Sequence, residues 1–249
     1  MLVTIPGQPP IMAQRHGGPH AGLLALHGWG RDRHDWDTVL SGTDALAVDL
    51  PGFGATAEPE TPWTTAQYAC RLASALGKEP MAIIGHSFGG RIAVHIAAQE
   101  PDRVKALILT GVPLLRPRAE SGRNSPIGFR IAKTLRRIGM IPESVLEAAR
   151  GKYGSRDYLE SQGIMRQILI EAVNEDYSKQ LALIAKARIP VALIWGAQDS
   201  AAPLSIAERS LEILGCNAHL TVVPASGHIL DGALINALRG EIACMLEAC

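Results

Sequence analysis

Short apolar runs alternate with helical patterns along most of this chain. Apolar runs without polar alternation are typical of strands buried on both faces of a parallel sheet. They cover residues 23–26, 45–48, 81–84, 104–109, 191–195 and 219–223. Helices are predicted over 65–76, 88–99, 205–214 and 233–248. This alternation predicts an α/β fold with a mostly parallel central sheet, flanking helices and right-handed crossovers.

Two further features complete the predicted organisation. Runs at 2–5 and 11–14, with Gly7 and Pro9 between them, predict a leading hairpin. The stretch 113–186 contains no convincing strand, and its helix-like patterns at 127–138, 143–150 and 163–173 are punctuated by Gly and Pro. We therefore predict a core formed by 1–112 and 187–249, with a helical cap, 113–186, inserted after the sixth strand. An insertion there would lie over the edge where such sheets bind ligands.

The composition excludes several classes of protein. The 249 residues are 47% hydrophobic and 19% charged, with a mean hydropathy of +0.11, which is unlike a disordered chain. The 24 basic residues balance 24 acidic ones, and the pI is near 7.1. This balance argues against nucleic acid as the main partner and against a polybasic membrane anchor.

The sequence also indicates a compartment. The first residues lack the features of a secretory signal, and no apolar run approaches the roughly 18 residues of a membrane span. Four cysteines, without a CxxC pair or metal-ligand spacing, are expected to be reduced thiols that pack as small buried hydrophobes. We expect a cytoplasmic protein with no stable membrane anchor.

The strongest chemical signal is the segment Gly85-His86-Ser87-Phe88-Gly89-Gly90, which matches Gly-x-Ser-x-Gly. It follows a predicted strand and precedes a predicted helix, which is the context that a nucleophile turn requires. The turn would expose the Ser87 hydroxyl beside a helix N-terminus, which favours developing negative charge. Ser87 is therefore the predicted nucleophile.

A serine nucleophile needs a base held by an acid. Asp199 and His228 each follow a later predicted strand, so one sheet edge can gather them with Ser87. The order Ser, Asp, His is the one expected of an α/β-hydrolase triad. Asp231 is a competing acid, but it lies three residues beyond His228 and is predicted to begin the next helix.

Attack on a carbonyl also needs donors for the developing oxyanion. One predicted donor is the backbone N–H of Phe88, which follows the nucleophile. The other is the backbone N–H of Trp29, in the loop His27-Gly28-Trp29-Gly30 that follows a predicted strand.

Together with Asp49-Leu-Pro-Gly-Phe-Gly54, these segments resemble the α/β-hydrolase superfamily, specifically its capped, esterase-like branch. The resemblance covers the core nearly end to end. It implies a triad of Ser87, Asp199 and His228, and an oxyanion hole formed by the Trp29 and Phe88 amides. The pairing of His-Gly-Trp-Gly with Asp-Leu-Pro-Gly-Phe-Gly also resembles carrier-protein methyl-ester esterases, from which His86 and Phe88 depart, so the subfamily stays open.

These residues predict a serine hydrolase that cleaves a carboxylic ester in a small-molecule acyl substrate through an acyl-enzyme. A thioesterase, a carrier-protein methyl-ester esterase and a C–C bond hydrolase are alternatives, because they share the same apparatus. A small-molecule receptor built on a retired hydrolase is the non-enzyme alternative. No metal-binding motif and no dinucleotide-binding motif is found, so neither a metal nor a cofactor is expected.

Charge is unevenly distributed along the chain. Residues 114–186 contain 13 Lys and Arg and 8 Asp and Glu, and most of the excess lies in 116–137. A solvated amphipathic helix face accounts for this pattern most simply. The functional alternative is a basic cap that attracts an anionic acyl carrier or a carboxylated substrate.

Overall fold

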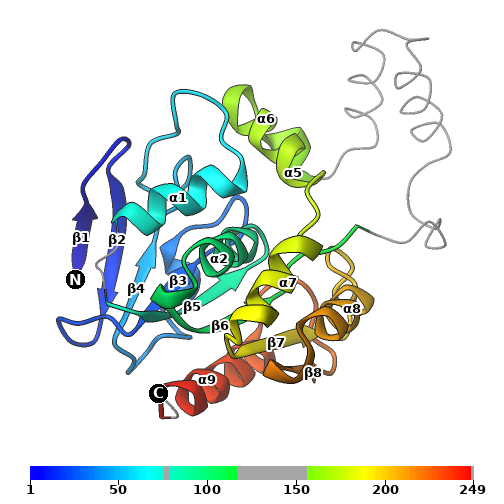
Figure 1. Cartoon of the computed structure of the whole chain (residues 1–249). Helices are drawn as coiled ribbons and strands as arrows, with labels where there is room; N and C mark the ends of the chain where they lie inside the picture. The colour runs from blue at the N-terminus through cyan, green and yellow to red at the C-terminus, as the bar shows by residue number, and fades with distance from the viewer. Residues whose placement is uncertain (76–78, 117–155, 248–249) are drawn as a thin grey trace, which may run out of the picture.

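A mostly parallel sheet forms the centre of the molecule in the computed structural model, which describes residues 1–75, 79–116 and 156–247 (Figure 1). Its order is β1-β2-β4-β3-β5-β6-β7-β8, with β1–β2 and β2–β4 antiparallel and the other pairs parallel. The predicted α/β fold and leading hairpin are confirmed. The strands are β1 (Leu2–Ile5), β2 (Ile11–His16), β3 (Leu23–Leu26), β4 (Ala45–Val48), β5 (Met81–His86), β6 (Val104–Thr110), β7 (Val191–Gly196) and β8 (Ala218–Val223).

Helices cover both faces of this sheet. One face carries α1 (Thr65–Ala75), α2 (Phe88–Gln99), α7 (Ser178–Ala187) and α8 (Leu204–Leu214). The other carries α9 (Gly232–Glu247) and the short 3₁₀ helix η1 (Arg33–Trp36). The remaining described helices are η2 (Pro101–Arg103), α5 (Arg156–Glu160), α6 (Gly163–Ala172) and η3 (Gly215–Asn217). The four helices predicted for the core are found with their described ends within one residue of the expected positions.

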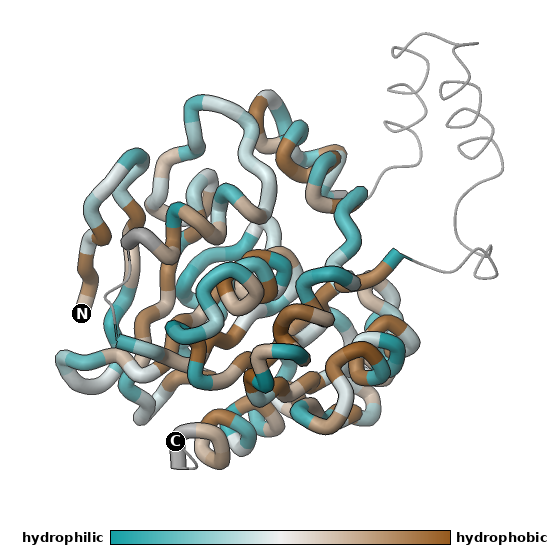
Figure 2. The backbone as a smooth tube through the Cα atoms, viewed as in Figure 1, coloured by the Kyte–Doolittle hydropathy of each residue, from teal (hydrophilic) through white to brown (hydrophobic). Residues whose placement is uncertain are grey.

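The continuous apolar runs reflect burial on both faces of the sheet. In β3, Leu24 and Leu26 belong to the core under α1 and α2, whereas Leu23 and Ala25 belong to the core under α9. Figure 2 shows hydrophobic residues concentrated along the central strands. β8 differs from the expectation, because it lies at the sheet edge and only Val223 in it is fully buried.

The predicted insertion is only partly described. α6 matches one predicted helix, whereas the patterns at 127–138 and 143–150 lie outside the described residues. α5 and α7 were not predicted, and α7 packs against α2 and α8 although its residues fall within the predicted cap. The division of the chain at 112/113 and 186/187 stays a prediction.

The segment that leads into α7 is fastened to the core. The N–H of Tyr177 donates to the carbonyl of Leu114 at 2.9 Å, and the N–H of Arg116 donates to Asp176 at 3.1 Å. The hydroxyls of Tyr177 and of Thr65, at the start of α1, both donate to the Glu175 carboxylate. The chain therefore leaves and rejoins the core at neighbouring points.

The cysteine prediction was wrong in one respect. Cys70, Cys216 and Cys244 are free thiols, as expected, but all three are exposed rather than buried. Cys70 lies in α1, where its thiol donates to Gln99 Oε1 of α2 at 3.5 Å, Cys216 lies in η3 and Cys244 lies in α9. Cys249 lies outside those residues. Within the described part of the chain, no helix is both long enough and apolar enough to cross a membrane.

The first turn of α2 approaches β3 too closely for side chains. A Cβ on Gly89 would lie 2.3 Å from the Leu26 carbonyl oxygen, and a Cβ on Gly85 would lie 2.5 Å from the Gly90 Cα. These neighbours are backbone atoms, which cannot rotate away. The glycines of the predicted nucleophile turn are therefore required by this contact.

This contact predicts that Gly89→Ala lowers the free energy of unfolding by about 3 kcal/mol or more, because backbone must move to admit the methyl group. Gly240→Ala is the matched control, since Gly240 lies in α9 with open space around its Cα. That substitution should raise stability by about 0.5–1 kcal/mol. Urea denaturation measures both variants, and equal stability of the two would contradict the assignment.

Candidate active site

Ser87 lies between the last residue of β5 and the first residue of α2. Its backbone has φ 49° and ψ −112°, a left-handed conformation that non-glycine residues rarely adopt. The Ser87 N–H donates to the Thr110 carbonyl at the end of β6, at 3.0 Å. This strand–turn–helix geometry leaves the side chain half-buried at the carboxyl edge of the sheet.

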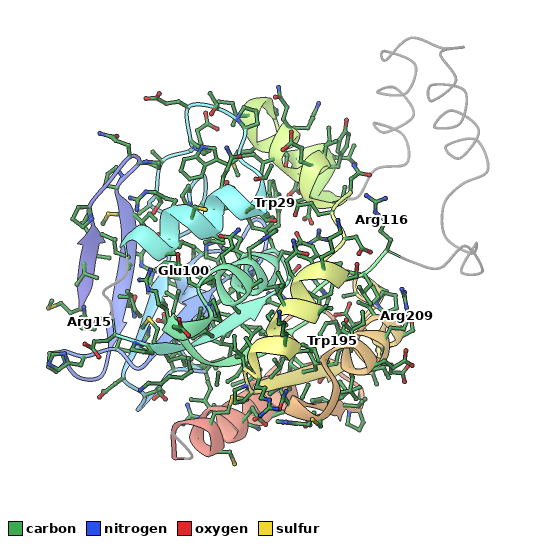
Figure 3. The ribbon with its side chains drawn as sticks, in the orientation of Figure 1. Arg15, Trp29, Glu100, Arg116, Trp195 and Arg209 are labelled. Carbon is green, nitrogen blue, oxygen red and sulfur yellow. The ribbon has the colours of Figure 1, made fainter. Side chains whose placement is uncertain are left out.

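Asp199 lies in the loop after β7, and its side chain is buried. Its carboxylate accepts hydrogen bonds from the N–H groups of Ala201 and Ala202, at 2.9 and 2.8 Å. The indole of Trp195, in β7, donates to the Ala202 carbonyl at 2.7 Å (Figure 3). These contacts fix the loop so that the second carboxylate oxygen points at His228.

His228 lies in the loop after β8, and its ring joins the other two residues. Nδ1 lies 2.9 Å from Asp199 Oδ2, and Nε2 lies 3.1 Å from Ser87 Oγ. Because a carboxylate only accepts, we assign the ring proton to Nδ1, which leaves Nε2 free to accept from the serine hydroxyl. The structure thus brings the three predicted residues into one hydrogen-bonded chain.

Two glycines make room for the hydrogen bonds that link Ser87, His228 and Asp199. A Cβ on Gly111, which follows β6 with φ 59°, would lie 3.1 Å from both Asp199 Oδ2 and His228 Nδ1. A Cβ on Gly196, at the end of β7, would lie 2.4 Å from the Gly227 carbonyl oxygen. The loops after β6, β7 and β8 can therefore converge.

Asp231, the competing acid, has a different role. Its Oδ1 accepts from the Leu234 N–H and from the Ser226 hydroxyl, both at 2.9 Å. The Leu234 N–H is the largest cause of the lowered pKa of Asp231. Asp231 therefore caps α9 and does not hold the imidazole of His228.

The loop after β3 carries the predicted oxyanion donor Trp29. The buried His27 Nδ1 donates to the Gly28 carbonyl at 2.7 Å, and Nε2 accepts from the Leu50 N–H at 3.0 Å. Desolvation by burial lowers the pKa of His27, which favours this neutral form. The N–H of Gly89 donates to the His27 carbonyl at 3.0 Å, so this loop is joined to the nucleophile turn.

The two predicted oxyanion residues also touch through their side chains. The Trp29 and Phe88 rings meet edge to face with centroids 5.0 Å apart, and Phe53 contacts Trp29 at 4.9 Å. Among the described residues, neither backbone N–H, of Trp29 or of Phe88, has a hydrogen-bond acceptor.

The α5–α6 segment lies over this aromatic group (Figures 1 and 3). The indole of Trp29 donates to Ser161 Oγ at 3.3 Å. Met165 packs so closely on Gly52 that a Cβ there would lie 2.3 Å from its sulfur. Sequence reasoning missed Ser161 and Met165, because their partners lie more than 100 positions away along the chain.

His86, adjacent to the nucleophile, is buried. Its Nε2 donates to the main-chain carbonyl of His228 at 2.9 Å. Desolvation, followed by the proximity of His228, lowers the pKa of His86 to about 4. His86 is therefore neutral at ordinary pH.

In residues 1–75, 79–116 and 156–247, no group of three or more His, Cys, Asp and Glu side chains is arranged to hold a metal ion. The side chains of Ser87, Asp199 and His228 and the backbone amides of Trp29 and Phe88 are the groups available for chemistry at this site.

The model of the alpha/beta hydrolase family matches residues 23–235, and the chain belongs to this family. Two relatives are similar over shorter stretches. An esterase of Mycobacterium tuberculosis is 38% identical over 108 residues, covering 41% of this chain and 36% of that protein. A pimeloyl-[acyl-carrier protein] methyl ester esterase of Neisseria meningitidis serogroup B is 38% identical over 92 residues, covering 35% of each chain.

These alignments span about a third of the length of the two relatives. Among solved structures, a putative lipase from Acinetobacter baumannii superposes with a TM-score of 0.73 at 20% identity, covering 100% of this chain and 91% of that one. This likeness shows the shared fold.

The buried neutral His86 predicts a pH-dependent stability. In the unfolded chain His86 is protonated below its ordinary pKa of 6.5, whereas in the folded chain it stays neutral down to about pH 4. This contribution to stability is therefore full above pH 6.5 and is lost as the pH falls toward 4. Between about pH 7 and about pH 4.5, the wild type should lose about 2 kcal/mol more unfolding free energy than His86→Gln. Urea denaturation at both pH values tests this, and equal losses would refute it.

Proposed function

We propose that this chain is a serine hydrolase that cleaves carboxylic esters through an acyl-enzyme intermediate. The observation that carries the proposal is the hydrogen-bonded chain from Ser87 Oγ through the His228 ring to Asp199. The left-handed Ser87 backbone at a strand–helix turn supports it. So do the N–H groups of Trp29, in the loop after β3, and of Phe88, the first residue of α2, which have no acceptor among the described residues.

In the proposed mechanism, His228 Nε2 takes the hydroxyl proton while Ser87 Oγ attacks the ester carbonyl carbon. The carbonyl oxygen becomes an oxyanion and accepts from the Trp29 and Phe88 N–H groups. Asp199 stabilises the imidazolium that forms. The C–O bond then breaks, the alcohol leaves with the proton from His228, and the acyl group stays on Ser87. Water, activated in the same way, releases the acid and restores the serine.

We propose residues 113–186 as a cap over this site, because the described α5–α6 segment contacts Trp29 and Gly52. A second candidate substrate is a carrier-protein methyl ester or thioester. The basic excess of residues 114–186 favours this candidate, as does the similarity to the carrier-protein methyl ester esterase. Hydrolytic C–C cleavage uses the same residues and is a further alternative.

Ser87→Ala should abolish covalent labelling by a fluorophosphonate and lower kcat on a short p-nitrophenyl ester by at least about 10³-fold, because no nucleophile remains. Ser41→Ala is the matched control, since Ser41 is exposed and lies beside Gly22 and Asp44, which precede β3 and β4 at the sheet edge opposite Ser87. Gel fluorescence and absorbance assays measure both effects.

Two results would refute the esterase proposal. Normal labelling of Ser87→Ala would remove the nucleophile assignment. A wild-type protein that binds an acyl ligand tightly but turns over no ester or thioester would instead favour the receptor alternative.

The candidate carrier substrate predicts a dependence on salt. Raising the ionic strength from about 0.01 M to about 0.15 M shortens the Debye length from about 30 Å to about 8 Å. We expect kcat/KM for an acyl-carrier methyl ester to fall at least about tenfold, while kcat/KM for a neutral p-nitrophenyl ester changes less than about twofold. Equal responses of the two substrates would exclude attraction of the carrier by the basic segment.

A further inference from the structure

One side chain connects the nucleophile turn directly to the loop of the base. β5, which ends at His86, and β8, which precedes His228, are separated in the sheet by β6 and β7. The His86 ring nevertheless reaches the main chain of His228, with Nε2 2.9 Å from the carbonyl oxygen. The centroids of the His86 and His228 rings lie 5.0 Å apart.

The direction of this hydrogen bond follows from the acceptor. A carbonyl oxygen cannot donate, so His86 Nε2 carries the proton and Nδ1 does not. Nδ1 is buried and has no hydrogen-bond partner in the described part of the chain. The ring is closely confined on that side, because a Cβ on Gly28 would lie 2.8 Å from Nδ1. One tautomer and one orientation are therefore favoured.

His228 is thereby held at three points by different kinds of contact. Asp199 holds ring atom Nδ1 and Ser87 meets ring atom Nε2, whereas His86 holds the backbone. The loop before His228 is irregular, because β8 ends at Val223 and Ala225 is left-handed, with φ 61°. The Gln198 N–H anchors this loop at the Ser226 carbonyl, at 2.9 Å, and His86 adds a second anchor at His228 itself. A ring fixed only at its end atoms could still shift with this loop.

We propose that His86 is a positioning residue that sets the distance between the base His228 and the nucleophile Ser87 through its Nε2–H···O=C hydrogen bond. This inference rests on the proposed serine-hydrolase function. The neutral form of His86 also suits the reaction. The two ring centroids are 5.0 Å apart, so a positive charge on His86 would oppose the imidazolium that forms on His228. His86 itself exchanges no proton with the substrate.

Three substitutions test the hydrogen bond rather than the volume of the side chain. His86→Gln places an amide N–H near the former Nε2 position and keeps the donor. His86→Asn has an amide that is one methylene too short, and His86→Leu has no donor. His95→Leu is the matched control, because His95 is also buried on the α2 side but its ring packs on Tyr177, away from the triad.

We expect His86→Leu and His86→Asn to lower kcat on a p-nitrophenyl ester by about 10–100-fold with KM changed less than about twofold, because a small misplacement of a base slows proton transfer without weakening binding. The rate of fluorophosphonate labelling should fall in parallel. His86→Gln should retain at least about a third of the wild-type kcat, and His95→Leu should match the wild type once folding is verified by circular dichroism. The Asn and Gln pair decides the result if His86→Leu does not fold.

Equal kcat losses in His86→Gln and His86→Asn would overturn the proposal, since the donor would then be irrelevant. A rise in KM at unchanged kcat would overturn it as well. A wild-type chain that is neither labelled nor active refutes the proposed function itself. A wild type labelled at the same rate as His86→Leu refutes only the role of His86.

Discussion

The close approach of the first turn of α2 to the end of β3 determines the geometry of the whole site. Gly89 meets the backbone of Leu26 there, and in the turn itself Gly85 of β5 meets Gly90 of α2, so no side chain fits at either place. β5 can pass into α2 through a single residue only if that residue, Ser87, adopts a left-handed conformation. The same contact lets the Gly89 N–H bond to His27, so the nucleophile turn and the loop with Trp29 form one rigid unit.

The second requirement is that a buried carboxylate be fully hydrogen-bonded. Asp199 meets it with two backbone N–H groups and one imidazole N–H, so it remains buried without an unsatisfied oxygen. Parallel strands make this arrangement possible, because their carboxyl ends lie along one edge. Gly111 and Gly196 then allow loops from three strands to meet at His228.

Much of this arrangement could be predicted from the sequence, because it depends on neighbouring residues. The strand–turn–helix context of Ser87 is local, and the order of Asp199 and His228 along the chain follows from the fold. The contact of His86 with His228 could not be predicted, since no sequence motif marks a side chain that donates to a main-chain carbonyl of a distant loop. β8 was expected to be buried because an apolar run does not reveal whether its strand lies at an edge. The packing of α7 on α2 and α8 could not be predicted, because Gly and Pro mark the ends of helices without indicating which element they pack on.

Two hydrogen bonds, from Tyr177 to Leu114 and from Arg116 to Asp176, join the points where the chain leaves and rejoins the core. The core therefore depends little on how many residues lie between these points. Those contacts hold the entry and exit points together independently of the hydrogen bonds among Ser87, His228 and Asp199. Doubling the length of a flexible connection costs only about 0.6 kcal/mol in closure entropy. A lineage could therefore exchange this segment for another, and acquire a new substrate preference, while the catalytic framework stays unchanged.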